Sequence, residues 1–181
     1  MSFVATLRKA TAADHDAVDA GFGVFRLDDA TDYGLFLVAH AQALHVVETA
    51  LAGDSTLPAW RPRAALLAAD LAALGLAMPA SAPAPAIARL DDPDGRWGAL
   101  YVIEGSRLGG RVLAKTVPSA LPTAYLAAVH EQGEWRTLLA AIDARGAASD
   151  DRARAAIIRG ARQTFALFAA AALAAHADRH R

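Results

Sequence analysis

The stretch Glu104-Gly105-Ser106-Arg107-Leu108-Gly109-Gly110 lies inside a region that otherwise favours a helix. Residues 97–103 and 112–115 on either side are strongly apolar, so one long helix is expected here. Each glycine within a helix costs about 1 kcal/mol relative to alanine, and three in six residues therefore need a reason. Gly98, Gly105 and Gly109 lie within about 40° of one another around the axis. Such a stripe makes the helix easy to bend and lets either a flat ligand or a neighbouring helix approach the backbone; the glycines alone do not decide which.

The rest of the chain predicts an all-α fold. Alanine, leucine and arginine dominate, and clusters of β-branched residues with a period of two are missing. Asp92-Pro93 combines an N-cap with a first-turn proline, and Ser149-Asp150-Asp151 places negative charge at a helix start. The expected helices span residues 3–21, 31–52, 61–75, 93–117, 122–131, 133–145 and 149–178. A chain of 181 residues has the usual size of one domain, so we expect a single domain over 1–181. The proline-containing stretch 78–85 is expected to be a loop.

Composition excludes several classes of function. The net charge of −1 and the pI of about 6.6 indicate no polyanion partner such as nucleic acid. The absence of cysteine excludes disulfides, thiolate catalysis and Cys-ligated zinc or iron–sulfur clusters. The first residues do not resemble a signal peptide, and no stretch approaches the length of uninterrupted large apolar residues that a membrane span needs. A soluble, cytoplasmic protein is therefore expected.

Common catalytic motifs are also missing. The sequence has no His-Glu-x-x-His, no phosphate-binding loop and no Gly-x-Ser-x-Gly. Paired Glu-x-x-His motifs are absent, which counts against a carboxylate-bridged di-iron centre. Glu104 shares a helical stripe with Arg107, Arg111 and Lys115, and this stripe is expected to be a solvated charged face.

His15 is the first candidate ligand. It lies on the flank of the apolar stripe of the first expected helix, which is formed by Val4, Leu7, Thr11, Val18 and Phe22. The alternative is a hydrogen-bonded core histidine. Arg8 lies two turns earlier and about 20° away around the axis. A cation that shares a face with a neutral imidazole suits a ligand with a metal at its centre and an anion at its edge.

The remaining histidines give weaker signals. His40 and His45 are about 140° apart around a helix, so they cannot bind one ion together. His176 and His180 share a helical face, but they lie in the last six residues. We interpret these two as a solvated, fraying end.

Two stretches resemble the heme oxygenases. Leu7-Arg8-Lys9-Ala10-Thr11-Ala12-Ala13-Asp14-His15 is similar to the amino-terminal helix of that family, in which a Leu-x-x-Ala-Thr-x-x-x-His run supplies the proximal iron ligand. The run Tyr101–Gly110 resembles the distal helix of the bacterial, biliverdin-producing branch, including the enzymes that serve bacteriophytochromes. The two motifs stand in the family's order, about 90 residues apart. Weaker similarity extends over nearly the whole chain, at residues 32–36, 45–48, 70–75, 132–135 and 160–165.

The resemblance implies that heme lies between the first helix and the glycine helix, with His15 as the iron ligand. Gly105 and Gly109 would let the distal backbone approach the iron and bound dioxygen, with Ser106 and Gly110 beside them in the same catalytic wall. A distal side bare of strong acids and bases would favour oxidation of the heme's own meso carbon. Many heme oxygenases carry an aspartate at the position of Ser106, where it orders the water that delivers protons, whereas the bacterial branch commonly has serine.

Heme propionates would need cations at the mouth of the pocket. Arg8, Lys115 and Arg162 match the family positions approximately. An ideal helix places Lys115 about 100° from the glycine stripe, which makes it the weakest of the three matches.

The function implied by the resemblance is oxidative cleavage of heme to biliverdin, carbon monoxide and ferrous iron. The chain has no flavin or iron–sulfur motif, so electrons would come from a ferredoxin or a flavoprotein reductase, and a bacteriophytochrome is a possible receiver of the product. Two alternatives stay open. One is a heme-binding or heme-sensing protein on the same fold without turnover, and the other is a heme-free helical domain in which His15 and the glycines only pack.

Overall fold

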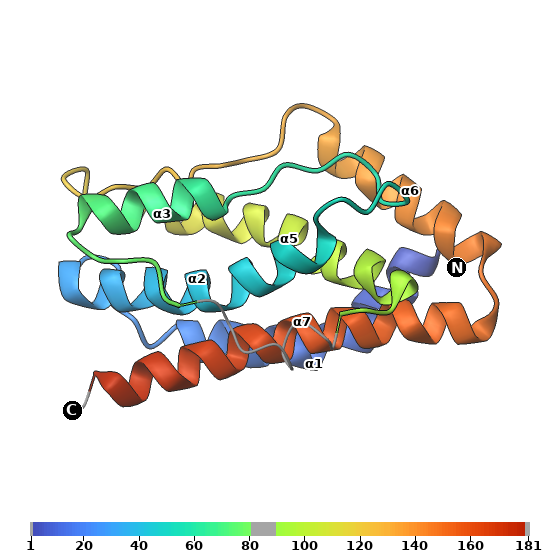
Figure 1. Cartoon of the computed structure of the whole chain (residues 1–181), viewed down its shortest axis with the longest axis horizontal. Helices are drawn as coiled ribbons and strands as arrows, with labels where there is room; N and C mark the ends of the chain where they lie inside the picture. Colours follow the sequence, from blue (N-terminus) through green and yellow to red (C-terminus); the bar gives the residue numbers. More distant parts are fainter. Residues whose placement is uncertain (1, 81–89, 180–181) are drawn as a thin grey trace.

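Six α-helices, and no strand, make up the part of the chain that the computed structural model describes, residues 2–80 and 90–179 (Figure 1). The helices are α1 (Phe3–Phe22), α2 (Ala30–Leu51), α3 (Ala64–Ala73), α5 (Pro93–Leu113), α6 (Glu134–Ala148) and α7 (Asp151–Asp178). This is the all-α architecture that the composition predicts. Part of the expected loop at 78–85 lies outside the described residues.

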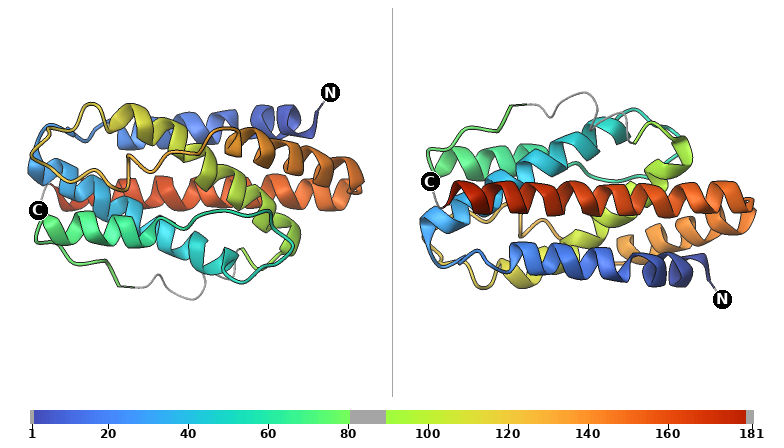
Figure 2. Two further views of the ribbon diagram at one scale, coloured as in Figure 1. Left: turned by 90° about the horizontal axis from the view of Figure 1, so that it is seen from above. Right: turned by 90° about the horizontal axis from the view of Figure 1, so that it is seen from below.

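The long helix α7 runs along the whole molecule, with α1 beside it (Figure 2). It packs against α1, α2 and α5, so these four helices share one core. The helix α3 lies against α2, and α6 contacts both α1 and α5. This arrangement leaves α1 and α5 as two walls with α2 and α7 between them.

Side-chain caps start four of the helices, as the sequence predicts for α5 and α7. In each, an oxygen of the cap residue accepts a hydrogen bond from a backbone N–H of the first turn. The cap residues are Ser2 for α1, Asp29 for α2, Asp92 for α5 and Asp150 for α7.

One glycine of α5 and one of α7 allow these two helices to pack closely. A Cβ atom at Gly98 would collide with the carbonyl oxygen of Ile157 on α7, and one at Gly160 on α7 would collide with the carbonyl oxygen of Gly95. The packing explanation for the glycine stripe is therefore correct for Gly98. It does not extend to Gly105 and Gly109, which lie farther along α5 and face the cavity described below.

The expected helix at 122–131 is wrong. This segment forms turns and irregular backbone. The buried carboxylate of Asp70 accepts hydrogen bonds from the backbone N–H groups of Ala124 (3.1 Å) and Tyr125 (2.8 Å), and the Tyr125 side chain is only 1% exposed. Because these N–H groups and the large aromatic ring are fixed by distant partners, the local preference for a helix is overridden.

Two other helices are at least four residues shorter than expected. The expected helix 61–75 is confined to Ala64–Ala73 because the Glu48 carboxylate accepts hydrogen bonds from the backbone N–H groups of Arg63 (2.6 Å) and Ala64 (3.0 Å) and so starts the helix there. The glycine helix ends at Leu113, four residues before the expected end.

The helix α2 is the one helix among residues 2–80 and 90–179 that is long and apolar enough to cross a membrane. In the fold, 67% of its most apolar window is buried against other helices, as in the core helix of a globular domain.

Candidate functional site

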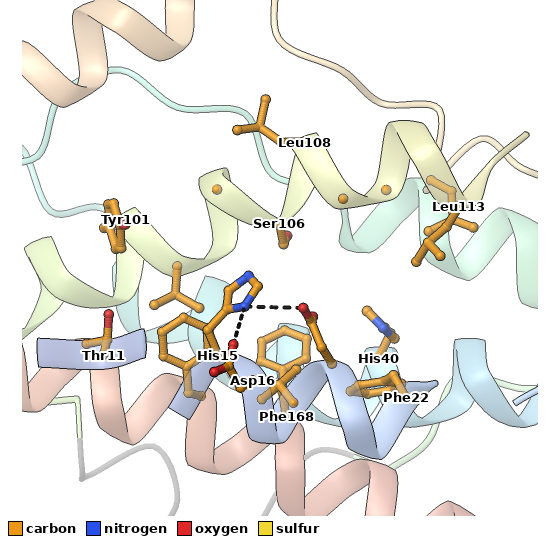
Figure 3. Close-up of a pocket in the computed structure, with 18 of the residues that line it drawn as sticks. Thr11, His15, Asp16, Phe22, His40, Tyr101, Ser106, Leu108, Leu113 and Phe168 are labelled. Atoms are coloured by element: carbon orange, nitrogen blue, oxygen red, sulfur yellow. Dashed lines mark ion pairs between the residues drawn. The ribbon is translucent and has the colours of Figure 1, made fainter. Parts of the chain in front are cut away.

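A cavity of about 500 Å³ lies between α1 and α5, with side chains of α2 and α7 between them (Figure 3). Its volume is in the range of small-molecule sites, roughly 300–1,000 Å³. The wall from α1 contributes Arg8, His15 and Phe22, and the wall from α5 contributes the glycines of the opening motif. Aromatic residues of α2 and α7 make the interior apolar. The slot expected between the first helix and the glycine helix is therefore present.

His15 projects from α1 into this cavity, and its side chain is 59% exposed there. Its Nδ1 atom lies 3.2 Å from the Asp19 carboxylate, one turn along the same helix, and the ring packs edge-on to Phe165. When Nδ1 donates its proton to Asp19, the Nε2 lone pair is free, and Figure 3 shows that nitrogen turned away from the carboxylates. His15 is thus a cavity residue with a free ring nitrogen, not a core histidine.

The three glycines of the motif have different surroundings. A Cβ at Gly109 would meet nothing within 4 Å, so the cavity reaches the backbone there. A Cβ at Gly105 would lie 3.5 Å from Cη2 of Trp135, in ordinary contact. A Cβ at Gly110 would lie 3.0 Å from the carbonyl oxygen of Leu126, which shows that Gly110 accommodates the 122–131 segment. Gly109 is therefore the position at which a ligand can lie directly against α5.

Ser106 points into the cavity and is held by a buried arginine (Figure 3). The Arg63 guanidinium, at the start of α3, donates to the Ser106 hydroxyl at 2.7 Å and to the carbonyl oxygen of Ile103 at 2.6 Å. Arg63 is 3% exposed and lines the cavity. The sequence suggested a distal side bare of strong acids and bases. The structure adds a permanent positive charge, the Arg63 guanidinium, behind Ser106.

A second histidine, His40 on α2, also lines the cavity. The centroid of its ring lies 4.3 Å from the ring centroids of both Phe22 and Phe36. Its Nδ1 atom is 2.8 Å from the hydroxyl oxygen of Tyr125. Burial, with a smaller effect from the nearby Arg63 charge, lowers the pKa of His40 from 6.5 to about 3. His40 is therefore neutral at physiological pH and fixed by an aromatic cluster.

The three predicted cations occupy unequal positions. Arg8 lines the cavity. Arg162 is directed to the carbonyl oxygen of Ala10 (2.8 Å) and to Asp14 (3.5 Å) on α1, outside the cavity lining. Lys115 is exposed in the turn after α5 and does not line the cavity either.

The stripe expected to be a solvated charged face is buried at Glu104 and Arg107 and exposed at Arg111 and Lys115. Glu104 and Arg107 are 3% and 2% exposed and form an ion pair with Nε 2.9 Å from Oε2. The same carboxylate oxygen lies 3.1 Å from Nε2 of His130, and Arg107 also donates to carbonyl oxygens of Arg61 and Ala128. The expectation is wrong for Glu104 and Arg107, because the α2–α3 and α5–α6 loops cover this part of α5.

The interpretation of His176 and His180 as a solvated, fraying end is wrong for His176. The helix α7 continues through Asp178, and His176 is half-buried within it, so His176 does not lie in a fraying end. His180 lies outside the described residues.

Comparison with solved structures identifies the architecture. A heme oxygenase from Neisseria meningitidis superposes with a TM-score of 0.77 at 23% identity, over 98% of this chain and 93% of that one. A heme oxygenase from Leptospira interrogans superposes with a TM-score of 0.71 at 19% identity, over 95% of this chain and 98% of that one. The chain has the heme oxygenase fold.

A comparison of sequences points in the same direction. A heme oxygenase of Xanthomonas campestris pv. campestris (strain 8004) is 38% identical to this chain over 115 residues. The aligned region spans 60% of this chain and 66% of that protein, just under two thirds of its length. No protein-family profile matches the sequence.

The heme oxygenase fold places the two motifs of the sequence on opposite walls of one cavity, with His15 on α1 and the glycines on α5. The likeness is to heme oxygenases of three bacteria, and it does not distinguish the bacteriophytochrome-associated branch. The cavity is also lined by four residues that the sequence did not predict as site residues, namely Arg63, His40, Tyr125 and Trp135.

Proposed function

We propose that this protein is a heme oxygenase, which cleaves heme to biliverdin, carbon monoxide and ferrous iron with dioxygen and external electrons. The observation that carries the proposal is the pairing of the two walls: the free Nε2 of His15 enters the cavity from α1, and the open backbone at Gly109 lies on α5 opposite. The 38% identity to a heme oxygenase supports it.

The cavity residues suit heme. The rings of Phe22, Phe165 and Phe168 provide an apolar surface for a flat macrocycle, and neutral imidazole is a good ligand for iron. Arg8 is the cation of α1 that lines the cavity, and a heme propionate would bind there. When bound, the heme supplies the redox-active iron. The protein positions the heme, excludes bulk water and supplies protons.

We assign the organisation of the distal wall to Arg63 and Ser106. The Ser106 hydroxyl donates to the carbonyl oxygen of Ile103 at 2.7 Å and accepts from Arg63, so its own proton is already used. Arginine does not release its proton in proteins. Protons must therefore reach the distal side through water, which the guanidinium and the hydroxyl orient. This arrangement takes over the task that aspartate has in other members of the family.

The finer parts of the proposal rest on the length and composition of the chain and on its family resemblance. They are a single domain over 1–181, a cytoplasmic location, electrons from a ferredoxin or a flavoprotein reductase, and delivery of biliverdin to a bacteriophytochrome. Arg162 and Lys115 would act at the outer edge of the propionates.

Hemin titration followed by turnover tests the function. The purified protein should bind one hemin with a histidine-ligated spectrum, and ascorbate in air, with catalase present to exclude peroxide chemistry, should convert the complex to green biliverdin. Binding without biliverdin would favour the heme-sensing alternative, and absence of binding would favour a heme-free helical domain. The Neisseria protein is described in its NO- and CO-bound forms, so CO binding to the reduced complex is a second spectral readout.

Two histidine variants test the assignment of the ligand. His15→Ala should lose the histidine-ligated spectrum and recover it with added imidazole. His40→Phe is the matched control, because it replaces the other histidine of the cavity by a ring of similar shape and should keep that spectrum. A wild-type spectrum in His15→Ala would show that another residue binds the iron.

A further inference from the structure

Trp135 fills the space that Gly105 leaves open. It is the second residue of α6, and its Cη2 atom is the one heavy atom found within 4 Å of a Cβ placed at Gly105. No atom comes as near at Gly109, one turn farther along α5. Both Trp135 and the two glycines line the cavity. The side-chain-free wall is therefore open at Gly109 and closed by the edge of an indole at Gly105.

The indole is held between two other rings. On one side it stacks with Tyr101 of α5, with centroids 6.0 Å apart and planes inclined by 30°. On the other side it stacks with His130, at 5.4 Å and 28°. Stacked pairs of this kind stabilise a single ring orientation. We call the three residues Tyr101, Trp135 and His130 the aromatic stack.

Polar contacts fix the outer end of the aromatic stack. His130 is buried, with Nε2 3.1 Å from the Glu104 carboxylate. Burial lowers the pKa of His130, so the ring is neutral and Nε2–H donates to Glu104. Beside Trp135, the Glu134 carboxylate accepts two hydrogen bonds from Arg61, at 3.1 and 2.7 Å. A bidentate pair restricts the start of α6 and with it the position of the indole.

We infer that Trp135 is a specificity-determining residue that sets how heme is turned within its own plane and hence which meso carbon is opened. The inference rests on the proposed function. The four meso carbons of heme are related by near-fourfold symmetry, so an apolar slot by itself distinguishes them poorly. An asymmetric wall, closed at Gly105 and open at Gly109, admits the methyl- and vinyl-bearing edges of the macrocycle unequally. The aromatic stack keeps that wall rigid.

The test is Trp135→Phe, which keeps an aromatic ring for stacking but removes the edge that reaches Gly105. Trp60→Phe is the control, because it makes the same substitution at a partly buried tryptophan that does not line the cavity. The first readout is the proton NMR spectrum of the ferric complex, in which shifted heme methyl resonances report each heme orientation without turnover. The second is the distribution of biliverdin isomers.

Wild-type protein and Trp60→Phe should show one dominant orientation and one dominant isomer. In Trp135→Phe the population of the minor heme orientation should rise at least about fivefold, with the same change in the biliverdin isomers.

His130→Gln is the second variant, should Trp135→Phe fail to fold. It keeps a donor for Glu104 but removes one ring of the aromatic stack, and it should shift the heme orientations in the same direction. A mixed wild type, or unchanged orientations in a hemin-bound variant, would overturn the inference and leave the proposed function intact. Absence of hemin binding in the wild type would instead overturn the proposed function.

Discussion

Replacing Gly109 by alanine separates catalysis from packing, because the two roles predict opposite effects. A methyl group there meets nothing within 4 Å in the protein itself. The substitution should therefore have no steric cost and should gain helix propensity, up to about 1 kcal/mol. For a domain of this size, that free energy raises the melting temperature by about 2–4 °C.

The same methyl group would stand on a glycine that lines the cavity, whose other wall carries His15. Adding one carbon to a filled site costs about 1–3 kcal/mol, so crowding of dioxygen or of ordered water should slow biliverdin formation at least about fivefold. Hemin binding through His15 should persist. The assays are thermal unfolding of the apoprotein by circular dichroism, hemin titration, and the initial rate of biliverdin formation with ascorbate and catalase.

Gly98→Ala is the matched control on the same stripe of α5. Its methyl group would meet the carbonyl oxygen of Ile157 and, at 2.6 Å, the backbone nitrogen of Ala161. Backbone atoms cannot move aside cheaply, so we expect a loss of about 3 kcal/mol in the free energy of unfolding. A Gly109→Ala variant that lost stability while turning over heme at the wild-type rate would refute the reasoning, because Gly109 would then be a packing glycine.

Further predictions concern the charged and titratable residues of the cavity. Arg63→Lys should slow biliverdin formation more than Ser106→Ala, because the shorter, non-planar lysine side chain cannot place an ammonium where the Arg63 Nη2 atom donates to both the serine hydroxyl and the adjacent carbonyl; initial rates at saturating hemin compare the two. With its pKa lowered from 6.5 to about 3, neutral His40 contributes stability that is complete above pH 6.5 and is lost as the pH falls toward 3. Urea unfolding of His40→Phe between pH 4 and 7 should therefore show a shallower loss toward acid, by up to about 1.4 kcal/mol per pH unit, and an unchanged slope would contradict the pKa. Arg8→Gln should speed hemin transfer to apomyoglobin more than Arg162→Gln, because Arg8 lines the cavity and Arg162 is directed to α1; equal rates would argue against propionate binding at Arg8.

Most of the helices could be predicted from the sequence because their determinants are local. The caps Asp29, Asp92 and Asp150 act on backbone groups two or three residues away. The buried stripe of α1 follows from periodicity alone, and Val4, Leu7, Thr11 and Phe22 are buried as expected. The slot between α1 and α5 was implied by the resemblance of two motifs.

The polar half of the cavity could not be predicted because its determinants are distant in sequence. Arg63 reaches Ser106 across 43 positions, and Tyr125 reaches His40 across 85. The segment that carries Tyr125 has helix-favouring alanines, and distant partners such as the buried Asp70 explain why it is not helical. Glu104 was wrongly predicted to be solvated for the same reason, because no residue near it in the sequence indicates that two distant loops cover it. A polar residue such as His40 within the strongly apolar α2 was the one usable signal of a special environment.

The two covering loops are attached mainly through their main chains. Arg107 binds the carbonyl oxygens of Arg61 and Ala128, and Asp70 binds the N–H groups of Ala124 and Tyr125. An attachment of this kind does not depend on which side chain stands at the attached position. The anchors belong to helices, whereas several residues of the loops face the cavity or solvent. Substitutions in these loops can therefore remodel the lining of the cavity while the scaffold that holds them stays unchanged, which makes this side of the molecule tolerant of evolutionary change.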